Sequence, residues 1–188
     1  MPAMVGTAAL DWVLSTTGVR HEEVDALLAA TRRAPTGCAC CRTSRPPASA
    51  PLRGAPAAGR THWCLLESTP ADLIRATCEG IGYAARHCLA AAGLTGTLAV
   101  CGGGTRSPAW MRLLADVLGR PLRVVEGEVG ARGAVLAAAE RFGTALDAAA
   151  WTEPTRVVQP DADRAAYYAK GYEEHLGRLA QARERARS

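Results

Sequence analysis

The sequence has 188 residues, of which 48% are hydrophobic, enough to bury one ordinary core, so a single domain over residues 1–188 is expected. It has no run of about 18 apolar residues and no signal-peptide pattern, which argues against membrane insertion and export and makes the cytoplasm the expected location. The formal net charge is only +4, and its arginines are interspersed with acidic residues and few aromatic ones, which argues against nucleic acid as a partner.

Two helices are predicted at the start of the chain. Over residues 6–17, apolar side chains recur at helical spacing, and Gly18 follows the last of them. Residues 21–33 carry acidic side chains near the first turn, including Asp25, and two arginines near the last. This order matches the helix dipole, which favours negative charge at the N-terminus and positive charge at the C-terminus.

The stretch over residues 35–66 shows no helical or strand periodicity. It is predicted to be an irregular insert or disordered, although structureless loops of this length are uncommon inside compact domains. Its thiol and imidazole groups are candidate zinc ligands: Cys38, Cys40, Cys41, His62 and Cys64. Their spacing is not that of a usual zinc knuckle, so no metal ligand is assigned, and a small cysteine-rich metal-binding module remains an alternative.

Residues 69–93 carry a long helical pattern. It opens with a hydroxyl side chain as a cap and Pro70 in the first turn, both favourable at a helix start. Gly80 and Gly82 are expected to let this helix pack closely on a sheet. Glu79, beside them, is expected to order the neighbouring backbone.

The stretch over residues 97–139 organises the rest of the chain. A strand-like run over residues 97–101 passes directly into three adjacent glycines, and Ser107 and Pro108 then favour the start of a helix as N-cap and first helical residue. A second strand is predicted over residues 122–125. The unit is therefore a strand, a glycine loop, a helix and a strand.

The glycine loop of this unit predicts a ligand site. Glycine lacks Cβ, so that a flat or anionic ligand can approach the backbone, and the helix start beyond it is expected to offer unpaired N–H groups. A nucleotide fits both features. The loop is neither the dinucleotide fingerprint nor a P-loop, since no lysine follows it.

The C-terminal part is predicted to be mainly helical. A short alanine-rich helix is expected over residues 131–141, an extended piece over 157–160, and a long polar helix over 161–187 with Asp161 as its cap. Three tyrosines of the last helix are expected in the core: Tyr167, Tyr168 and Tyr172.

Several of these stretches together resemble the C-terminal domain of the FGGY carbohydrate kinases, most closely its xylulokinase-like members. They are residues 6–12, 71–81, 101–110, 114–121 and 130–134. The resemblance implies an α/β fold, the actin-like ATPase (ribonuclease H-like) lobe with a mixed sheet flanked by helices. It also implies ATP and Mg as cofactors, with nucleotide contacts at Gly102, Gly103, Gly104 and Ser107. Arg132 departs from the apolar residue usual at its position.

The resemblance further implies transfer of the ATP γ-phosphoryl group to a sugar hydroxyl, with a pentulose such as xylulose as the acceptor. The family's catalytic aspartate and first phosphate loops lie upstream of the segment seen here, so no catalytic residue is assigned and the chain is expected to be an inactive fragment on its own. Asp11, Asp72 and Asp116 are explained as surface or capping carboxylates. The sugar would bind only with a missing N-terminal lobe, a homo-oligomer is left open, and a non-catalytic remnant is the alternative.

A frameshift is our hypothesis for the irregular stretch, between about Gly37 and Trp63. GC-rich codons for Leu-Arg-Val-Leu-Pro-Tyr-Leu-Ser-Pro-Ala-Gly-Glu-Arg-Ala-Pro, read one base later, encode the residues from Cys38 to Pro51. The first of these peptides resembles the strand and Gly-Glu-Arg-x-Pro turn that the family carries at this point. The DNA sequence of the locus tests the hypothesis.

Overall fold

The computed structural model describes residues 6–31, 39–42, 59–62, 68–147, 149 and 153–185. Its central sheet is mixed and has the strand order β3, β4, β5. Strand β3 (Leu98–Val100) runs parallel to β4 (Leu122–Val124), and β5 (Arg156–Val158) pairs with β4 in the antiparallel sense. β3 and β4 lie where the sequence predicts strands, and β5 overlaps the extended piece predicted over residues 157–160.

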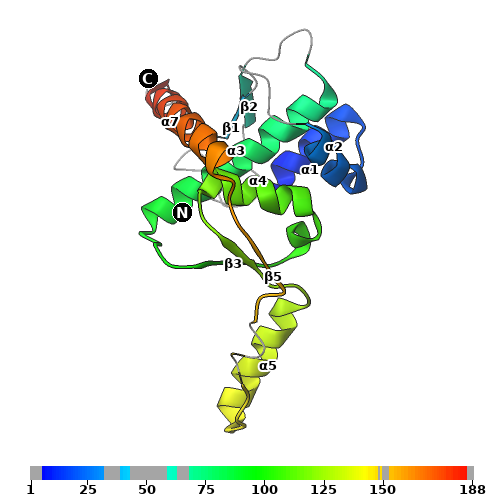
Figure 1. Cartoon of the computed structure of the whole chain (residues 1–188), viewed down its shortest axis with the longest axis vertical. Helices are drawn as coiled ribbons and strands as arrows, with labels where there is room; N and C mark the ends of the chain where they lie inside the picture. Colours follow the sequence, from blue (N-terminus) through cyan, green and yellow to red (C-terminus); the bar gives the residue numbers. More distant parts are fainter. Residues whose placement is uncertain are drawn as a thin grey trace.

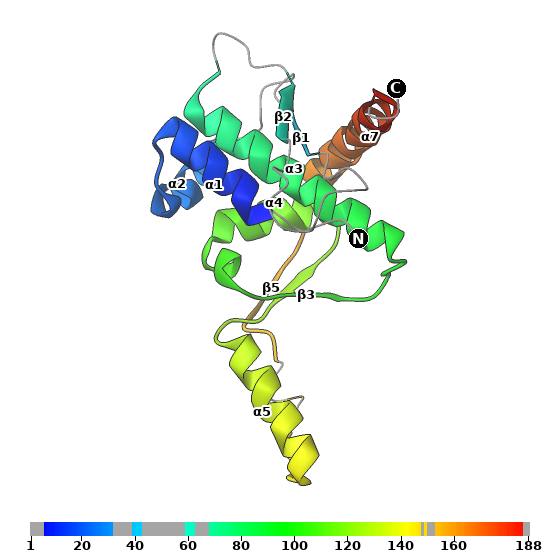
Figure 2. The ribbon, with the colours of Figure 1, turned by 180° about the vertical axis from the view of Figure 1, so that it is seen from behind.

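Most of the helices lie on one side of this sheet. Helices α1 to α4 and α7 gather on that side, and α5 extends away from the opposite end of the sheet (Figures 1 and 2). None of the helices in the described ranges is long and apolar enough to cross a membrane. The helical elements are α1 (Gly6–Thr17), the 3-10 turn η1 (His21–Glu23), α2 (Val24–Ala30), α3 (Pro70–Ala91), the 3-10 turn η2 (Gly103–Arg106), α4 (Pro108–Leu118), α5 (Val129–Phe142) and α7 (Ala162–Arg185).

Helix α4 joins the two halves of the core. Most of its residues are buried, among them the charged Asp116, and Arg112 is exposed. One face, with Leu113 and Val117, packs with α1, α2, α3 and Tyr168 of α7. The other face, with Met111 and Leu118, packs on Leu122 and Val124 of the sheet, among others.

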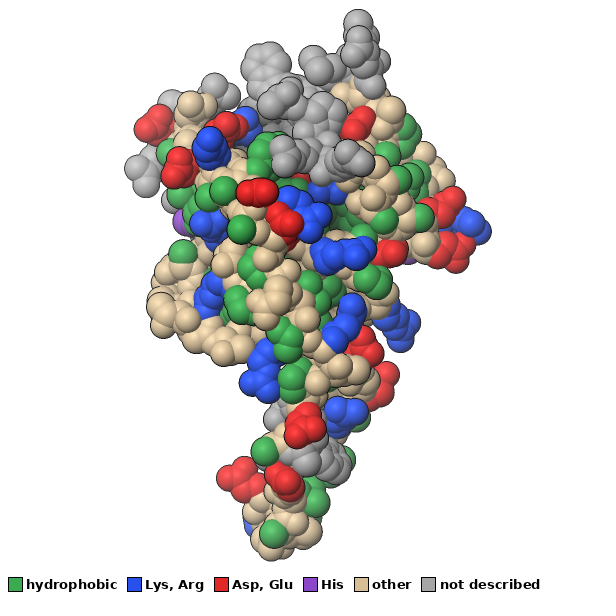
Figure 3. Space-filling view, viewed as in Figure 1, with side chains coloured by type: hydrophobic (Ala, Val, Ile, Leu, Met, Phe, Trp, Pro, Cys, Tyr) green, Lys and Arg blue, Asp and Glu red, His purple; other side chains and the backbone are tan. Residues whose placement is uncertain are grey.

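Helix α5 is the opposite case. None of its residues is buried, and Phe142 at its end is 81% exposed. Figure 3 shows α5 as the narrow lower part of the molecule, with acidic, basic and hydrophobic side chains interleaved along it.

The predicted helix over residues 21–33 is shorter and composite. It opens with the 3-10 turn, and α2 then ends at Ala30, with Thr31 in an extended conformation. The Glu23 carboxylate accepts a hydrogen bond from the backbone N–H of Arg20 at 2.8 Å, which closes the turn before α2 begins.

The sequence predicts an irregular segment without strands over residues 35–66, and for two short parts of it this prediction is wrong. β1 (Ala39–Arg42) and β2 (Gly59–His62) form a separate antiparallel pair, with Ala39 opposite His62 and Arg42 opposite Gly59. Backbone N–H and C=O groups pair whatever the side chains are, so such a ladder needs no periodic sequence. The rest of that stretch, including the candidate zinc ligands Cys38 and Cys64, lies outside the described residues.

Gly82 packs against a helix, not against the sheet as predicted. A Cβ on this residue of α3 would lie 3.0 Å from Cγ1 of Val117, a fully buried residue of α4. The glycine therefore sets the distance between α3 and α4.

Gly82→Ala is expected to lower the free energy of unfolding by about 1–3 kcal/mol, because the added methyl group overpacks this contact. Gly133 of α5 is the control, since no described atom lies within 4 Å of a Cβ placed there. Gly133→Ala is therefore expected to raise the free energy of unfolding by about 0.5–1 kcal/mol through helix propensity alone. Urea unfolding measures both variants, and a shift of the same sign in the two would contradict the packing described for Gly82.

Candidate functional site

The glycine loop follows the end of β3, where the sequence places it. Gly102 has φ +98°, a conformation that favours glycine, and the 3-10 turn η2 begins at the next residue. A Cβ on Gly102 or Gly103 would meet no described atom within 4 Å, whereas one on Gly104 would lie 3.3 Å from Nε1 of Trp110. The first two glycines thus face open space, and the third packs on α4.

The loop is held in shape by its own contacts and by the sheet. The hydroxyl of Thr105 donates to the Gly102 carbonyl at 2.7 Å. The Thr105 carbonyl in turn accepts from Nη2 of Arg156 on β5 at 2.6 Å. Nε of Arg156 lies 3.3 Å from Oε1 of Glu126, in an ion pair without hydrogen-bond geometry. The open face of the glycines is therefore fixed before any ligand arrives.

The prediction of unpaired N–H groups at the start of α4 is wrong. The N–H of Ser107 donates to the Gly104 carbonyl at 3.2 Å, and Pro108 has no N–H. The N–H of Ala109 donates to Oδ1 of Asp25 at 2.9 Å, and that of Trp110 donates to the Ser107 hydroxyl at 3.1 Å. All donors of the first turn are satisfied inside the protein, and Ser107 is the N-cap that the sequence predicts.

Asp25 also contacts the candidate site, and the sequence does not reveal this contact. Its Oδ1 also accepts a hydrogen bond from the Ser107 hydroxyl at 2.6 Å. This bond, followed by that from the Ala109 N–H, holds the pKa of the Asp25 carboxyl below its ordinary value. Asp25 and Ser107 lie 82 positions apart, and no local pattern of either marks the contact.

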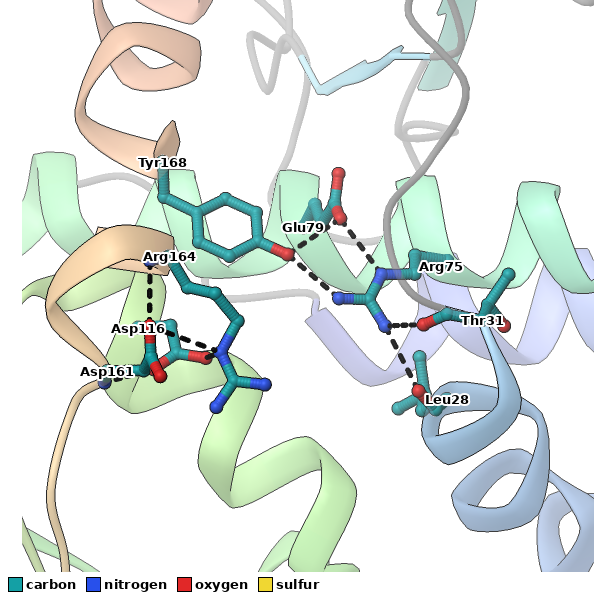
Figure 4. A network of polar contacts seen from close by, with 8 residues as sticks. All are labelled: Leu28, Thr31, Arg75, Glu79, Asp116, Asp161, Arg164 and Tyr168. Atoms are coloured by element: carbon teal, nitrogen blue, oxygen red, sulfur yellow. Dashed lines mark hydrogen bonds and ion pairs between the residues drawn. The ribbon is translucent and has the colours of Figure 1, made fainter. Parts of the chain in front are cut away.

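A buried polar network anchors the other end of α2 (Figure 4). Arg75 of α3 donates from Nη1 to the carbonyls of Leu28, at 3.0 Å, and Thr31. It also donates from Nε to Oε1 of Glu79 at 3.1 Å and from Nη2 to the Tyr168 hydroxyl at 2.8 Å. Arg75 therefore orders the backbone at the end of α2. That Glu79 orders the neighbouring backbone stays a prediction.

Glu79 and Tyr168 complete this network. The Tyr168 hydroxyl donates to Oε1 of Glu79 at 3.0 Å. Burial raises the pKa of Tyr168, so that its phenol stays protonated and can donate. Tyr168 is 1% exposed, which confirms its predicted place in the core.

A cavity of about 860 Å³ lies beside the network. It is bordered by α2, α3, α4 and the start of α7, and none of the three glycines of the loop lines it. Its lining residues are Leu28, Ala29, Thr31, Arg75, Ala109, Arg112, Leu113, Asp116 and Arg164.

The three aspartates considered from the sequence lie in separate local contacts. Asp72 forms a reciprocal cap with Thr69, and Asp11 lies 2.7 Å from Nε2 of His21. Asp116 is buried, which raises its pKa, and it accepts from the Asp161 N–H at 2.8 Å and pairs with Arg164. Within the described ranges, no group of three or more His, Cys, Asp or Glu side chains could hold a metal ion.

Comparison with known proteins gives consistent matches. Residues 3–141 match the model of the FGGY family of carbohydrate kinases, C-terminal domain. Erythritol kinase from Brucella abortus (strain 2308) is 39% identical over 105 residues, which is 52% of this chain and 20% of that protein.

Two solved structures show how far the likeness extends. Xylulose kinase from Rhodospirillum rubrum has a TM-score of 0.73 and 26% identity, and the match covers 93% of this chain and 38% of that one. Plasmodium falciparum glycerol kinase, solved with ADP, has a TM-score of 0.68 and 15% identity, with 93% and 37% covered, and supports the fold alone. The chain thus spans less than two fifths of each of these proteins.

Proposed function

Since the chain belongs to the FGGY family of carbohydrate kinases, whose C-terminal domain its residues 3–141 match, we propose that it carries the site at which a sugar or polyol kinase binds its adenine nucleotide. The glycine loop of this actin-like ATPase fold supplies the binding surface, at Gly102, Gly103 and Gly104. Ser107 acts indirectly, because its hydroxyl is engaged with Asp25 and with the Trp110 N–H.

The open and fixed face of the loop carries this proposal. It lies at the carboxyl end of β3, which is parallel to β4, and ligands of open α/β sheets bind beyond that end of parallel strands. The space in front of Gly102 and Gly103, where a Cβ would meet no described atom, suits close approach of a flat group to backbone. ATP therefore fits the residues present.

The complete reaction that we propose is transfer of the γ-phosphoryl group of ATP to a hydroxyl of a polyol or sugar, erythritol and xylulose being the substrates named for the matched kinases. Bound Mg²⁺ would offset the negative charge of the phosphates. This chain's part is to bind and orient the nucleotide. We assign the catalytic carboxylate and the sugar contacts to the portion of the relatives that it does not span, and place the reaction in the cytoplasm.

Gly103→Val is expected to weaken ADP binding by at least about tenfold, because the new side chain occupies the open face of the loop. Gly103 has no positive φ and no described atom near its Cβ position, so the fold should be kept. Gly96→Val is the matched control, since Gly96 is equally open but lies before β3. Calorimetric titration with ADP measures both, and equal affinities in the two variants would contradict the proposed site.

An assay of ADP formation separates binding from catalysis. With erythritol or xylulose as the acceptor, this chain alone is expected to bind ATP and to form no ADP that depends on the acceptor. Acceptor-dependent ADP formation would show that the chain carries a catalytic base of its own.

A further inference from the structure

The cavity of about 860 Å³ between α2, α3, α4 and α7 is separate from the proposed nucleotide site. None of the three loop glycines lines it, and its volume lies within the usual range of small-molecule pockets, about 300–1,000 Å³. We propose that it is a second binding site, which takes a small organic phosphate. The phosphate group of this ligand meets the arginines of the wall, and its carbon body covers the apolar part.

One face of α4 forms a wall of the cavity. Ala109, Arg112, Leu113 and Asp116 line it, at the spacing of three and four residues that brings side chains together on a helix. Arg112 is exposed, and none of the described residues forms a hydrogen bond or ion pair with it. Its charge acts on the Asp25 carboxylate only at a distance. The guanidinium of Arg112 is therefore available to a ligand.

Arg164 brings a second guanidinium, from the first turn of α7. Its Nε lies 2.9 Å from Oδ2 of Asp116, and its side chain is 44% exposed. The two outer nitrogens of Arg164 make no contact with the other residues drawn in Figure 4. An arginine presents its five N–H donors in a rigid fork, so that Nε can hold a carboxylate while the outer nitrogens meet a second anion.

The polar groups of the wall favour an anion. Three of the described lining residues are arginines and one is an acid, Asp116. Oδ1 of Asp116 already accepts from the Asp161 N–H, and its Oδ2 pairs with Arg164. The third arginine, Arg75, is buried and is balanced by Glu79, which does not line the cavity. A ligand is therefore expected to bring negative charge and several acceptor oxygens, as a phosphate group does.

The end of α2 adds an apolar surface that is held in place. Leu28 and Ala29 line the cavity there. Arg75 donates to the carbonyls of Leu28 and Thr31, so that these acceptors are occupied and the end of the helix is fixed. An inorganic phosphate ion would leave the apolar surface in contact with water, whereas a carbon body would cover it. An organic phosphate therefore fits the wall better than the inorganic ion.

Titration of the full chain with phenyl phosphate tests the site. The side-chain Nε–H resonances of Arg112 and Arg164 are expected to shift saturably, and the affinity is expected to exceed that for inorganic phosphate by at least about fivefold. Phenol, which has the same ring without the charge, is expected to give no saturable shift at the same concentrations. The absence of a saturable shift with phenyl phosphate, or equal binding of phenol, would overturn the proposal.

The same titration also locates the probe. The amide resonances of Gly102 and Gly103 are expected to stay in place, because neither residue lines the cavity. Saturable shifts at these glycines without shifts at Arg112 would mean that the probe binds at the glycine loop, and this outcome would likewise refute the second site.

Three variants separate a built site from general surface charge. Arg112→Gln is expected to weaken phenyl phosphate binding by at least about fivefold, because it removes charge-assisted donors. Ala29→Phe is expected to weaken binding as strongly at unchanged net charge, since the larger side chain occupies part of the cavity. Arg123→Gln is the matched control, because Arg123 is also exposed but lies on β4 and not in the lining. Equal losses in Arg112→Gln and Arg123→Gln would show that only the overall charge attracts the anion.

Discussion

Replacing Glu79 with alanine is expected to lower the free energy of unfolding by about 3–5 kcal/mol, because it leaves the buried guanidinium of Arg75 without its counter-charge. The side chains of the pair are only 8% and 9% exposed. The same change removes the acceptor of the Tyr168 hydroxyl, so that two buried donors lose a partner at once. Urea unfolding followed by circular dichroism measures the loss.

The pair of Arg178 and Glu174 is a matched control for this prediction. The nitrogen–oxygen distance, 3.1 Å, and the four-residue spacing on a helix are the same as in the Arg75 pair, but the Glu174 side chain is 66% exposed. Glu174→Ala is expected to change the free energy of unfolding by no more than about 0.5 kcal/mol. Similar losses in the two variants would show that burial does not set the importance of the Arg75 pair.

Stability is expected to fall by about 3 kcal/mol between pH 6.5 and pH 4 through His175 alone. Burial, aided by the positive charges of His87 and Arg178, lowers the pKa of His175 from 6.5 to about 4. The unfolded chain therefore takes up a proton at this position in a range where the folded protein does not. The contribution is fully present above pH 6.5 and is lost as the pH falls through the window.

His175→Gln isolates this effect from the titration of carboxylates. The variant is expected to lose less stability than the wild type over the same window, because its neutral side chain has no proton to gain on unfolding. Unfolding curves at several pH values measure the difference. Parallel pH profiles for the two proteins would mean that His175 takes up its proton equally in the folded and unfolded states.

The sequence predicts the unit around α4 well because its signals are local. Ser107 and Pro108 fix the start of the helix, and Gly119 with φ +63° ends it before the predicted second strand. The flanking strands follow from short apolar runs, and in β4 the side chains alternate, with Leu122 and Val124 buried and Arg123 exposed.

The parts that the sequence misses depend on distant partners. Asp25 looks like one acid among several at a helix start, and only the fold brings it to Ser107. The sequence predicts that Gly82 faces a sheet. A glycine in a helix indicates that another element packs closely there, but it does not indicate whether that element is a sheet or a helix. The pairing of β1 with β2 rests on backbone groups, which leave no periodicity to detect. The frameshift hypothesis for this stretch stays a prediction at the level of the DNA.

The position of Tyr168 in the chain has a consequence for the order of folding during synthesis. Its bonds to Glu79 and Arg75 join residues 89 and 93 positions apart. The ribosome makes α1 to α4 well before α7, so the Arg75 site stays open to water until the last helix has emerged. Contacts of such large separation are among the slowest to form. The helical layer therefore closes late, because its core is complete only after α7 has emerged from the ribosome.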